Sequence, residues 1–592
     1  MIQHIQKVIS DLYGAQIGEE QLQLQKTRKE FEGDVTLVVF PLLRVSKLSP
    51  EQTGQQIGEA MVNAVSHVVS YNVVKGFLNL SFSANYWVQR LNAMQATGNY
   101  GFRTKGEHSR NVMVEYSSPN TNKPLHLGHI RNNLLGYSVS EILKANGHTV
   151  RKVQVINDRG IHICKSMLAW QKYGEGETPR SSGLKGDKLV GKYYVEFDKR
   201  YKAEVAQLLE AGRTKEQAEA EAPIMTQARE MLLQWEANDA EVRQLWATMN
   251  GWVYAGFDET YHRLGVDFDR LYYESDTYLI GKELVESGVE DGIFEKREDG
   301  SIWCDLTADG MDQKLLLRKD GTAVYMTQDL GTAKLRYTDW PELNQLIYTV
   351  GNEQDYHFKV LFLLLGKLGF EWAKDCYHLS YGMVDLPSGK MKSREGTVVD
   401  ADDLMDEMVA TAKAQSEEKG KLDEMTEQEA DALFEMLGMG ALKYFMLKVD
   451  PKKRMLFNPE ESIDMQGNTG PFIQYTHARI RSVLAKAQAA DAGMQNVPTQ
   501  LDAINGNERS LIRLLDQYPE TVKVAGDEYS PAIIANYAYE LAKEYNAFYH
   551  ECPILVEEDE HIKTLRLFIS LITAQVLRSA MGLLGVSVPD RM

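Results

Sequence analysis

The segment that begins at residue 111 constrains the fold most, because it predicts a strand, a turn, a helix and a second strand in succession. NVMVEYSS (111–118) is strand-like and runs into a Pro/Asn turn. A long helical pattern follows over about 128–146 and stops at an Asn-Gly pair, as helix ends commonly do. HTVRKVQVIN (148–157) predicts the second strand. This βαβ unit implies a parallel sheet with a ligand crevice at the carboxyl end of its first strand.

Length and composition bound the class of protein. The chain has 592 residues, too many for one core, which suggests roughly four domains. Its 43% hydrophobic and 25% charged residues exclude a disordered or collagen-like chain. Apolar runs such as VLFLLLG (360–366) are too short to span a bilayer, and the N-terminus has no signal-peptide pattern. The closest cysteines, Cys304 and Cys376, are 72 residues apart, which argues against a zinc ribbon or a disulfide framework. We expect a cytoplasmic protein without membrane contact.

Further strand and helix patterns define the expected architecture, an α/β protein with a Rossmann-like, doubly wound parallel sheet. SIWCD (301–305), AVYM (323–326) and LIYTV (346–350) predict additional strands of this sheet. We also expect a small N-terminal α/β domain and an all-helical C-terminal domain. The expected parts are an N-terminal domain at 1–105, the parallel-sheet domain at 106–400 with a helical insertion at about 170–250, an acidic helical connection at 401–465 and the helical domain at 466–592.

The net charge of −19 is unevenly distributed. Residues 401–440 hold twelve Asp/Glu against three Lys, so their net charge of −9 is nearly half of the net charge of the chain. An acidic helix there could lie on a face remote from a polyanion while the rest of the chain binds one. The charge therefore neither excludes nor favours a nucleic-acid partner.

The most informative motif is SSPNTNKPLHLGHIRNN, which joins the first strand of the βαβ unit to its helix. His126 and His129 fall at the helix start, where unsatisfied N–H groups and the helix dipole favour an anion. Leu127 can anchor the turn with both imidazoles facing outward, and Gly128 lets a flat ring approach the backbone. These residues suit a nucleotide. Two surface histidines are the plain alternative, and a zinc site lacks a convincing third ligand.

A second motif, SGKMKSREGTVV (388–399), concentrates Lys390, Lys392 and Arg394 in a glycine-flanked loop. Such a loop can stabilise charge that develops on pyrophosphate. A solvated basic loop is the alternative, although pairing with HLGH makes the pattern more specific. Residues 186–193 spell GxxxxGK, but Tyr193 cannot take the Ser/Thr role on magnesium and no strand precedes it, so we reject a P-loop.

HLGH and KMKSR together resemble the HIGH and KMSKS signatures of class I aminoacyl-tRNA synthetases. Within that class, the chain resembles the arginyl-tRNA synthetase family over nearly its whole length. The resemblance rests on VEYSSPNTNKPLHLGHIRN (114–132), VYMTQDLGTA (324–333), YTVGNEQDYHF (348–358), NTGPFIQYTHARI (468–480) and the C-terminal LLGVSVPDRM.

The resemblance implies a ligase that activates L-arginine with ATP, which brings Mg²⁺, and transfers it to the 3′-terminal adenosine of tRNA(Arg). Members usually need bound tRNA for the first step. The implied parts are a tRNA-contacting N-terminal domain, a catalytic parallel-sheet domain and an anticodon-binding helical domain. Protein-bound zinc is not expected, and we expect a monomer. An RNA-binding relative without catalysis, or a ligase for another amino acid, is a competing hypothesis that the intact signatures and the pocket carboxylates disfavour.

The resemblance also implies site residues, which we assign at the positions of this sequence that match the family's motifs. The arginine pocket comprises Glu115, Asn120, Tyr325, Asp329 and Gln354, in which the carboxylates suit a guanidinium. The ATP site comprises Pro119, Asn120, His126, Leu127, Gly128, His129, Lys390 and Met391. For the anticodon we expect contacts from Tyr475, His477, Arg479 and Arg481, since unstacked bases favour aromatic and basic surfaces.

The basic loop departs from the family signature at one position. Ser393 stands where the signature has its second lysine. Lys123, ahead of His126, or Lys392, within the loop, could supply the missing charge. We expect His126, His129, Lys390 and Arg394 to act in catalysis together with one of these lysines, and the sequence leaves the choice between them open.

Overall fold

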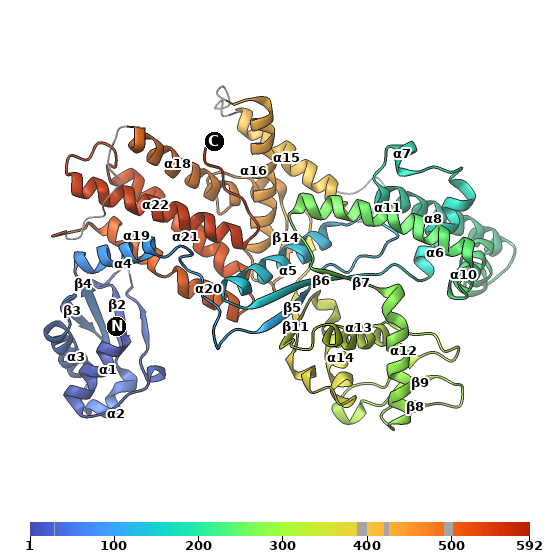
Figure 1. Ribbon diagram of the computed structural model, residues 1–592, viewed down its shortest axis with the longest axis horizontal. Coiled ribbons are helices and arrows are strands. Elements are labelled where there is room, and N and C mark those ends of the chain that lie inside the picture. Colours follow the sequence, from blue (N-terminus) through green and yellow to red (C-terminus); the bar gives the residue numbers. More distant parts are fainter. Residues whose placement is uncertain (29, 388–398, 419–424, 490–500) are drawn as a thin grey trace.

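The computed structural model describes residues 1–28, 30–387, 399–418, 425–489 and 501–592. Its centre is a five-stranded, all-parallel sheet with the order β12-β11-β5-β6-β7 (Figure 1). The strands are β5 (Asn111–Glu115), β6 (Thr149–Ile156), β7 (Arg270–Tyr273), β11 (Gln345–Gly351) and β12 (Cys376–Tyr381). The chain reverses its direction of winding between β5 and β11, so this doubly wound sheet has its switch point there and confirms the predicted fold class.

The βαβ unit forms as its sequence pattern predicts. Helix α5 (Leu127–Ala145) joins β5 to β6, and its apolar side chains are buried. The backbone N–H of Asn146 closes the helix on the carbonyls of Ile142 and Leu143. The carboxyl ends of β5 and β11 are therefore adjacent, at Glu115 and Gly351, on the edge of the sheet where ligands bind in folds of this kind.

Two predicted strands are not part of the parallel sheet. Residues 301–305 contain β9 (Ile302–Cys304), which pairs antiparallel with β8 (Glu295–Lys296) and β10 (Lys314–Leu317) in a separate small sheet. Residues 323–326 run into α13 (Tyr325–Asp339) instead of forming a strand.

The helical spacing of apolar residues explains why residues 323–326 do not form a strand. Met326, Leu330 and Ala333 are buried on one face of α13, and that spacing outweighs the strand propensity of a four-residue run. LIYTV does lie within β11, and VLFLLLG lies in α14 (Asp355–Lys367). Helix α12 (Glu274–Glu290) packs beside α13.

Six helices connect β6 to β7 and project from the sheet (Figure 1). They are α6 (Ile161–Tyr173), α7 (Pro179–Ser182), α8 (Gly186–Glu210), α9 (Lys215–Glu221), α10 (Pro223–Glu236) and α11 (Ala240–Leu264). The GxxxxGK sequence forms the first turns of α8, so it is helical and not a phosphate-binding loop. A Cβ at Gly186 would lie 2.0 Å from the carbonyl oxygen of Trp252, so α8 begins in close contact with α11.

The N-terminal part is an antiparallel sheet with helices, ordered β1-β2-β4-β3. Its elements are α1 (Ile2–Tyr13), β1 (Leu24–Lys26), β2 (Val35–Val38), α2 (Leu43–Ser46), α3 (Pro50–Ala64), β3 (Val68–Val74), β4 (Phe77–Phe82) and α4 (Ala84–Ala96). The Arg90 Nε donates to Asp516 Oδ1 at 2.7 Å, and the Tyr100 hydroxyl donates to the carbonyl of Leu515 at 3.0 Å. These contacts join this part to the C-terminal helices.

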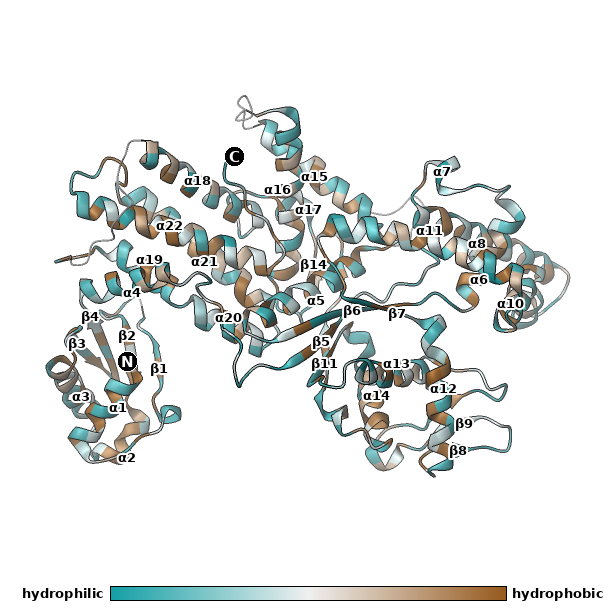
Figure 2. Cartoon of the chain, viewed as in Figure 1, coloured by the Kyte–Doolittle hydropathy of each residue, from teal (hydrophilic) through white to brown (hydrophobic). Residues whose placement is uncertain are grey.

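The chain after the parallel sheet is almost entirely helical, as predicted. Its elements are β13 (Val384–Asp385), α15 (Ala401–Glu418), α16 (Glu427–Leu447), β14 (Met455–Leu456), α17 (Pro459–Ser462), α18 (Gly470–Ala489), α19 (Gly506–Asp516), α20 (Tyr518–Asp527), α21 (Pro531–Glu551) and α22 (Glu560–Leu583). Hydrophobic residues are concentrated along α21 and α22, which pack together (Figure 2). Among the described residues, no helix is both long and apolar enough to cross a membrane.

Candidate active site

The turn between β5 and α5 is fixed by hydrogen bonds to neighbouring elements. Ser117 has a positive φ of 63°, and its backbone N–H donates to Asn132 Oδ1 at 2.6 Å. The backbone N–H of Asn157, which follows β6, donates to the carbonyl of Pro119 at 3.0 Å, and that of Thr121 donates back to the Asn157 carbonyl at 3.1 Å. The turn therefore spans the carboxyl ends of two strands and holds the start of α5 in place.

The two signature histidines cap α5 reciprocally. The Nδ1 of His126 accepts the backbone N–H of Gly128 at 3.1 Å, and the Nδ1 of His129 accepts the backbone N–H of His126 at 3.1 Å. The two rings are in contact, with centroids 3.9 Å apart. Because each Nδ1 accepts a hydrogen bond, each proton must reside on Nε2. Both imidazoles can therefore donate an Nε2–H to an oxygen of a bound ligand.

Both imidazoles are neutral in this environment. Burial, together with the charge of Lys123, lowers the pKa of His126 to about 4. The pKa of His129 also lies well below its ordinary value, because of burial and the nearby His126 and Lys123. Each neutral imidazole offers one Nε2–H donor to a phosphate oxygen, and Lys123 supplies positive charge to the same turn.

The helix start differs from the expected anion site in one respect. We expected unsatisfied backbone N–H groups there, but the N–H of Leu127 donates to the carbonyl of Val399 at 3.1 Å and that of Gly128 is taken by His126. A ligand anion would therefore meet imidazole donors and the helix dipole rather than free backbone groups. Both rings are only partly exposed, so they face less fully outward than predicted.

The expected basic loop cannot be placed, because Lys390, Met391, Lys392 and Arg394 lie outside the described residues. The chain that follows it returns to the signature turn. The N–H of Ala401 donates to the carbonyl of Leu125 at 2.9 Å, and Asp400 forms an antiparallel bridge with His126.

Glu115, predicted to anchor the arginine substrate, already has an internal partner. Its side chain lies at the carboxyl end of β5, is 8% exposed, and forms an ion pair with the buried Arg336 of α13. Burial raises the pKa of Glu115, while Arg336 opposes that shift. The guanidinium of Arg336 also lies 5.4 Å from the ring centre of Tyr348. Because one carboxylate carries one charge, Glu115 offers little net charge to a second guanidinium, and its role as an arginine anchor stays a prediction.

Other predicted pocket residues gather at the same edge of the sheet. Asn120 and Tyr325 line a cavity of about 460 Å³, and the Tyr325 side chain begins α13 with 72% of its surface exposed. Asp329 lies one turn further along α13, where it accepts a hydrogen bond from His357 Nε2 at 2.5 Å. Gln354 is exposed in the short turn (Asn352–Gln354) that follows β11.

Glu274 is a further acidic residue of this cavity, and no motif in the sequence predicted it. It is 7% exposed and accepts a hydrogen bond from Gln328 Nε2 at 2.6 Å. Burial raises its pKa to about 7, although Arg159 opposes that shift. A bound cation would stabilise its ionised form. The available signal was its position, since Glu274 directly follows β7 and thus lies at the carboxyl edge of the sheet.

The four residues predicted to contact an anticodon lie in three different environments. Tyr475 and Arg479 line a cavity of about 440 Å³ between the C-terminal helices, where the Arg479 guanidinium lies 4.9 Å from the Tyr475 ring centre. Arg481 is on the surface and forms an ion pair with Asp590 at 3.1 Å. His477 is only 1% exposed, and its Nδ1 bonds the carbonyl of Pro589 at 2.8 Å. Its burial contradicts the expected RNA contact and gives it a packing role against the C-terminus.

Within the described ranges, no group of three or more His, Cys, Asp or Glu side chains is arranged to hold a metal ion. The groups that the site presents are neutral imidazoles, a nearby lysine charge and acidic side chains of the pocket. This combination suits an anionic nucleotide beside a cationic substrate.

Comparisons with known proteins agree with this geometry. A family model described as "tRNA synthetases class I (R), catalytic domain" matches residues 91–458, and one described as "DALR anticodon binding domain" matches residues 473–592. Fold and site thus define a class I aminoacyl-tRNA synthetase. The chain is 61% identical to an "Arginine--tRNA ligase" of Bacteroides thetaiotaomicron, covering 98% of this chain and 97% of that protein. It belongs to the arginyl-tRNA synthetase family, which confirms the resemblance inferred from the sequence.

More distant proteins share the fold. An "Arginine--tRNA ligase" of Porphyromonas gingivalis is 57% identical over 99% of this chain and 98% of its own length. The structure of the arginyl-tRNA synthetase of Thermus thermophilus has a TM-score of 0.74 at 23% identity, and covers 100% of this chain and 99% of its own. That of Plasmodium falciparum has a TM-score of 0.77 at 20% identity, with 100% and 98% covered. The arrangement of elements is thus retained at low sequence identity.

Proposed function

We propose that the edge of the sheet at the carboxyl ends of β5, β7 and β11 is where this chain, an arginine–tRNA ligase, activates arginine. The observation that carries the proposal is the His126–His129 pair. Two neutral imidazoles, each with its Nδ1 engaged and its Nε2–H available, lie at the end of the turn whose Asn120 lines a cavity with acidic side chains. That arrangement supports ATP phosphates on one side and a cationic amino acid on the other.

In the first step, a carboxylate oxygen of arginine attacks the α-phosphorus of ATP in line. The bond from that phosphorus to the bridging oxygen breaks, pyrophosphate leaves with the bonding electrons, and arginyl-adenylate forms. His126 and His129 donate hydrogen bonds to phosphate oxygens, and Lys123 or Lys392 offsets the charge that develops on pyrophosphate. Preorganised donors of this kind need no reorganisation as the charge moves. Mg²⁺ arrives bound to ATP as part of that substrate.

Within ATP binding, Pro119, Leu127 and Gly128 form the wall next to the base and ribose, and Lys390, Met391 and Arg394 act from the loop. In the second step, the 2′-hydroxyl of the terminal adenosine of tRNA attacks the activated carbonyl carbon. Its proton is lost, the bond to the phosphate breaks, and AMP leaves. The protein's contribution to both steps is positioning and charge stabilisation.

For arginine itself, we assign the guanidinium to Asp329 and Glu274, with Tyr325 oriented alongside. Two carboxylates suit the planar fork of donors on a guanidinium. Asn120 and Gln354 hold the ammonium and carboxylate groups. Glu115 acts indirectly, since it is paired with Arg336 and fixes α13, which bears Asp329.

For tRNA(Arg), the C-terminal cavity with Tyr475 and Arg479 is the proposed anticodon contact, and Arg481 lies on the adjoining surface. A tyrosine and an arginine are suited to stacking against an unpaired base. The N-terminal part at 1–105 is a second tRNA contact, and the parts at 106–400, 401–465 and 466–592 are the catalytic, connecting and anticodon-binding domains. The protein acts as a cytoplasmic monomer.

The test is arginine-dependent exchange of pyrophosphate into ATP, measured with and without tRNA(Arg). We expect exchange with arginine and none with lysine or citrulline, and a His126→Ala variant should lose it. Full exchange by His126→Ala would contradict the assigned site. Comparing the reactions with and without tRNA also determines whether the first step depends on bound tRNA.

A further inference from the structure

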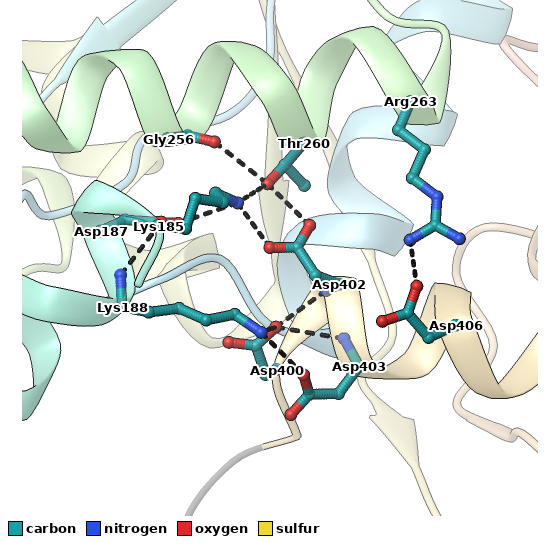
Figure 3. Close-up of polar contacts among 10 residues, drawn as sticks. All are labelled: Lys185, Asp187, Lys188, Gly256, Thr260, Arg263, Asp400, Asp402, Asp403 and Asp406. Atoms are coloured by element: carbon teal, nitrogen blue, oxygen red, sulfur yellow. Dashed lines mark hydrogen bonds and ion pairs between the residues drawn. The ribbon is translucent and has the colours of Figure 1, made fainter. Parts of the chain in front are cut away.

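A cluster of ion pairs joins the insertion to the chain beside the signature histidines. It consists of Lys185 and Lys188 at the start of α8 and Asp400, Asp402 and Asp403 at the start of α15; we call it the α8–α15 cluster. Figure 3 shows the two lysines pointing towards the aspartates across the gap between the helices. The cluster lies outside the proposed ATP and arginine contacts.

Lys185 makes the more buried half of the α8–α15 cluster. Its Nζ donates to Asp402 Oδ2 at 2.5 Å and to Thr260 Oγ1 of α11 at 2.5 Å, and it lies 3.3 Å from Asp187 Oδ2. Thr260 Oγ1 donates in turn to Asp402 Oδ1 at 2.9 Å (Figure 3). Because Asp187 is fully buried, removing Lys185 would leave carboxylates uncompensated in the interior.

Lys188 makes the more accessible half. Its Nζ donates to Asp403 Oδ1 at 2.7 Å and lies 3.5 Å from Asp400 Oδ1. The same Asp400 oxygen accepts the backbone N–H of Asp402 at 2.8 Å and so caps α15. Lysines in the first turn of α8 oppose that helix's dipole, whereas aspartates in the first turn of α15 favour theirs. The aspartates therefore offset an unfavourable placement of the lysines.

The α8–α15 cluster acts on the chain segment that touches the signature turn. Asp400 is bridged to His126, and its neighbours Val399 and Ala401 exchange backbone hydrogen bonds with Leu127 and Leu125. Helix α8 also reaches the turn directly, since a Cβ at Gly191 would lie 2.9 Å from Pro124 Cδ. The insertion, the turn and the start of α15 are thus held together at one point.

We propose that Lys185 and Lys188 are positioning residues for adenylate formation, which fix the His126–His129 pair by fixing Asp400 against it. The inference rests on the proposed role of those histidines. The lysines touch no reacting atom. They determine where residues 399–401 lie, and those residues complete the hydrogen bonding of the turn from which both imidazoles project.

Lys188→Ala is the test variant, because Lys188 is less buried than Lys185 and its loss is better tolerated. We expect about a tenfold fall in the single-turnover rate of adenylate formation at saturating ATP and arginine with tRNA present, since small displacements of catalytic groups are costly. The KM for arginine should stay within about twofold, because residues 399–401 hydrogen-bond the turn at Leu125 and Leu127, at the end that bears the histidines. Lys188→Arg should restore most of the rate.

Two further variants separate positioning from general destabilisation. Lys202→Ala removes a lysine of the same helix that pairs with Asp198 at 2.5 Å, and it should leave the rate unchanged. Asp403→Ala should lower the rate, and the double variant with Lys188→Ala should be no slower than the slower single variant, because Asp403 acts through its contact with Lys188. A general loss of stability would not lower the rate of adenylate formation while leaving the KM for arginine unchanged and allowing Lys188→Arg to restore the rate.

Comparing His126→Ala with Lys188→Ala distinguishes a failure of this inference from a failure of the proposed site. If His126→Ala abolishes adenylation but Lys188→Ala retains the wild-type rate, the positioning role is wrong and the site stands. If His126→Ala retains the wild-type rate, the proposed site itself is wrong. A loss in Lys188→Ala that Lys202→Ala matches, or that Lys188→Arg does not recover, also overturns the inference.

Discussion

Arg336 pairs with Glu115 in the interior, so an arginine of the chain itself occupies the carboxylate at the end of β5. Its guanidinium lies 5.3 Å from the ring centre of Tyr272 and 5.4 Å from that of Tyr348. This arrangement resembles a permanently filled cation site behind the substrate pocket. It ties the position of α13 to the central strand, and under the proposed function it leaves the recognition of free arginine to carboxylates on α12 and α13.

Glu115→Gln should destabilise the protein more than it impairs arginine recognition. The change leaves the Arg336 charge buried without a partner, which typically costs about 3 kcal/mol or more. Urea unfolding should show that loss, while Asp198→Asn, at an exposed pair on α8, should leave the free energy of unfolding almost unchanged. A stable Glu115→Gln protein with a greatly raised KM for arginine would instead make Glu115 a direct anchor.

Arginine affinity should rise with pH through the range around 7. The pKa of Glu274 is raised to about 7 by burial, so the carboxyl group is largely protonated below that pH. A guanidinium binds the ionised form and must displace the proton, so affinity should fall by up to about tenfold per pH unit below 7. Calorimetry in buffers of different ionisation enthalpy should detect proton release on arginine binding.

Glu274→Gln is the matched variant for that experiment. It should bind arginine more weakly at pH 8 and lose most of the pH dependence, because the titrating group is gone. An unchanged pH profile in Glu274→Gln would show that another group titrates.

His126→Ala should reduce adenylation by roughly 10²–10³-fold, as expected for loss of a preorganised donor to developing charge. The variant also loses the cap on Gly128, which should cost about 1 kcal/mol of stability. Because the pKa of His126 lies at about 4, the wild-type rate should show no His126 titration between pH 6 and 8. Single-turnover adenylation rates between pH 6 and 8 test the predicted rate loss and the absence of a titration, and thermal unfolding of both proteins tests the predicted loss of stability. A His126→Ala variant with the wild-type rate would contradict the catalytic role.

Local sequence patterns predicted the elements that depend on near neighbours. The strand, helix and strand around His126 followed from periodicity and from an Asn-Gly stop, and the parallel sheet followed from their order. The signature histidines were recognisable because HLGH sits at a strand-to-helix turn. The strand prediction for residues 323–326 is wrong because the helical spacing of apolar residues, which continues to Ala333, outweighs the strand propensity of four residues.

Pairings between distant parts of the chain could not be predicted from such patterns. Nothing local to Glu115 indicates that Arg336 neutralises it, and nothing local to Asp400 indicates a lysine partner on α8. The burial of His477 depends on the C-terminal Pro589, which reaches it only in the folded protein. Such long-range contacts decide which polar residues remain available to ligands, and they corrected the site more than the fold.

Lys123→Ala should slow adenylation more than Lys392→Ala, with little change in arginine binding. Pyrophosphate departure needs a cation, and Ser393 cannot supply one. Lys123 belongs to a turn that is fixed by hydrogen bonds, and its charge already reaches both signature histidines, where it lowers the pKa of each. A charge held in place before the reaction stabilises the transition state without reorganisation. Single-turnover measurement of adenylate formation in both variants decides between them, with arginine KM as the control. If Lys392→Ala is the slower enzyme, the loop supplies the charge and Lys123 only tunes the histidines.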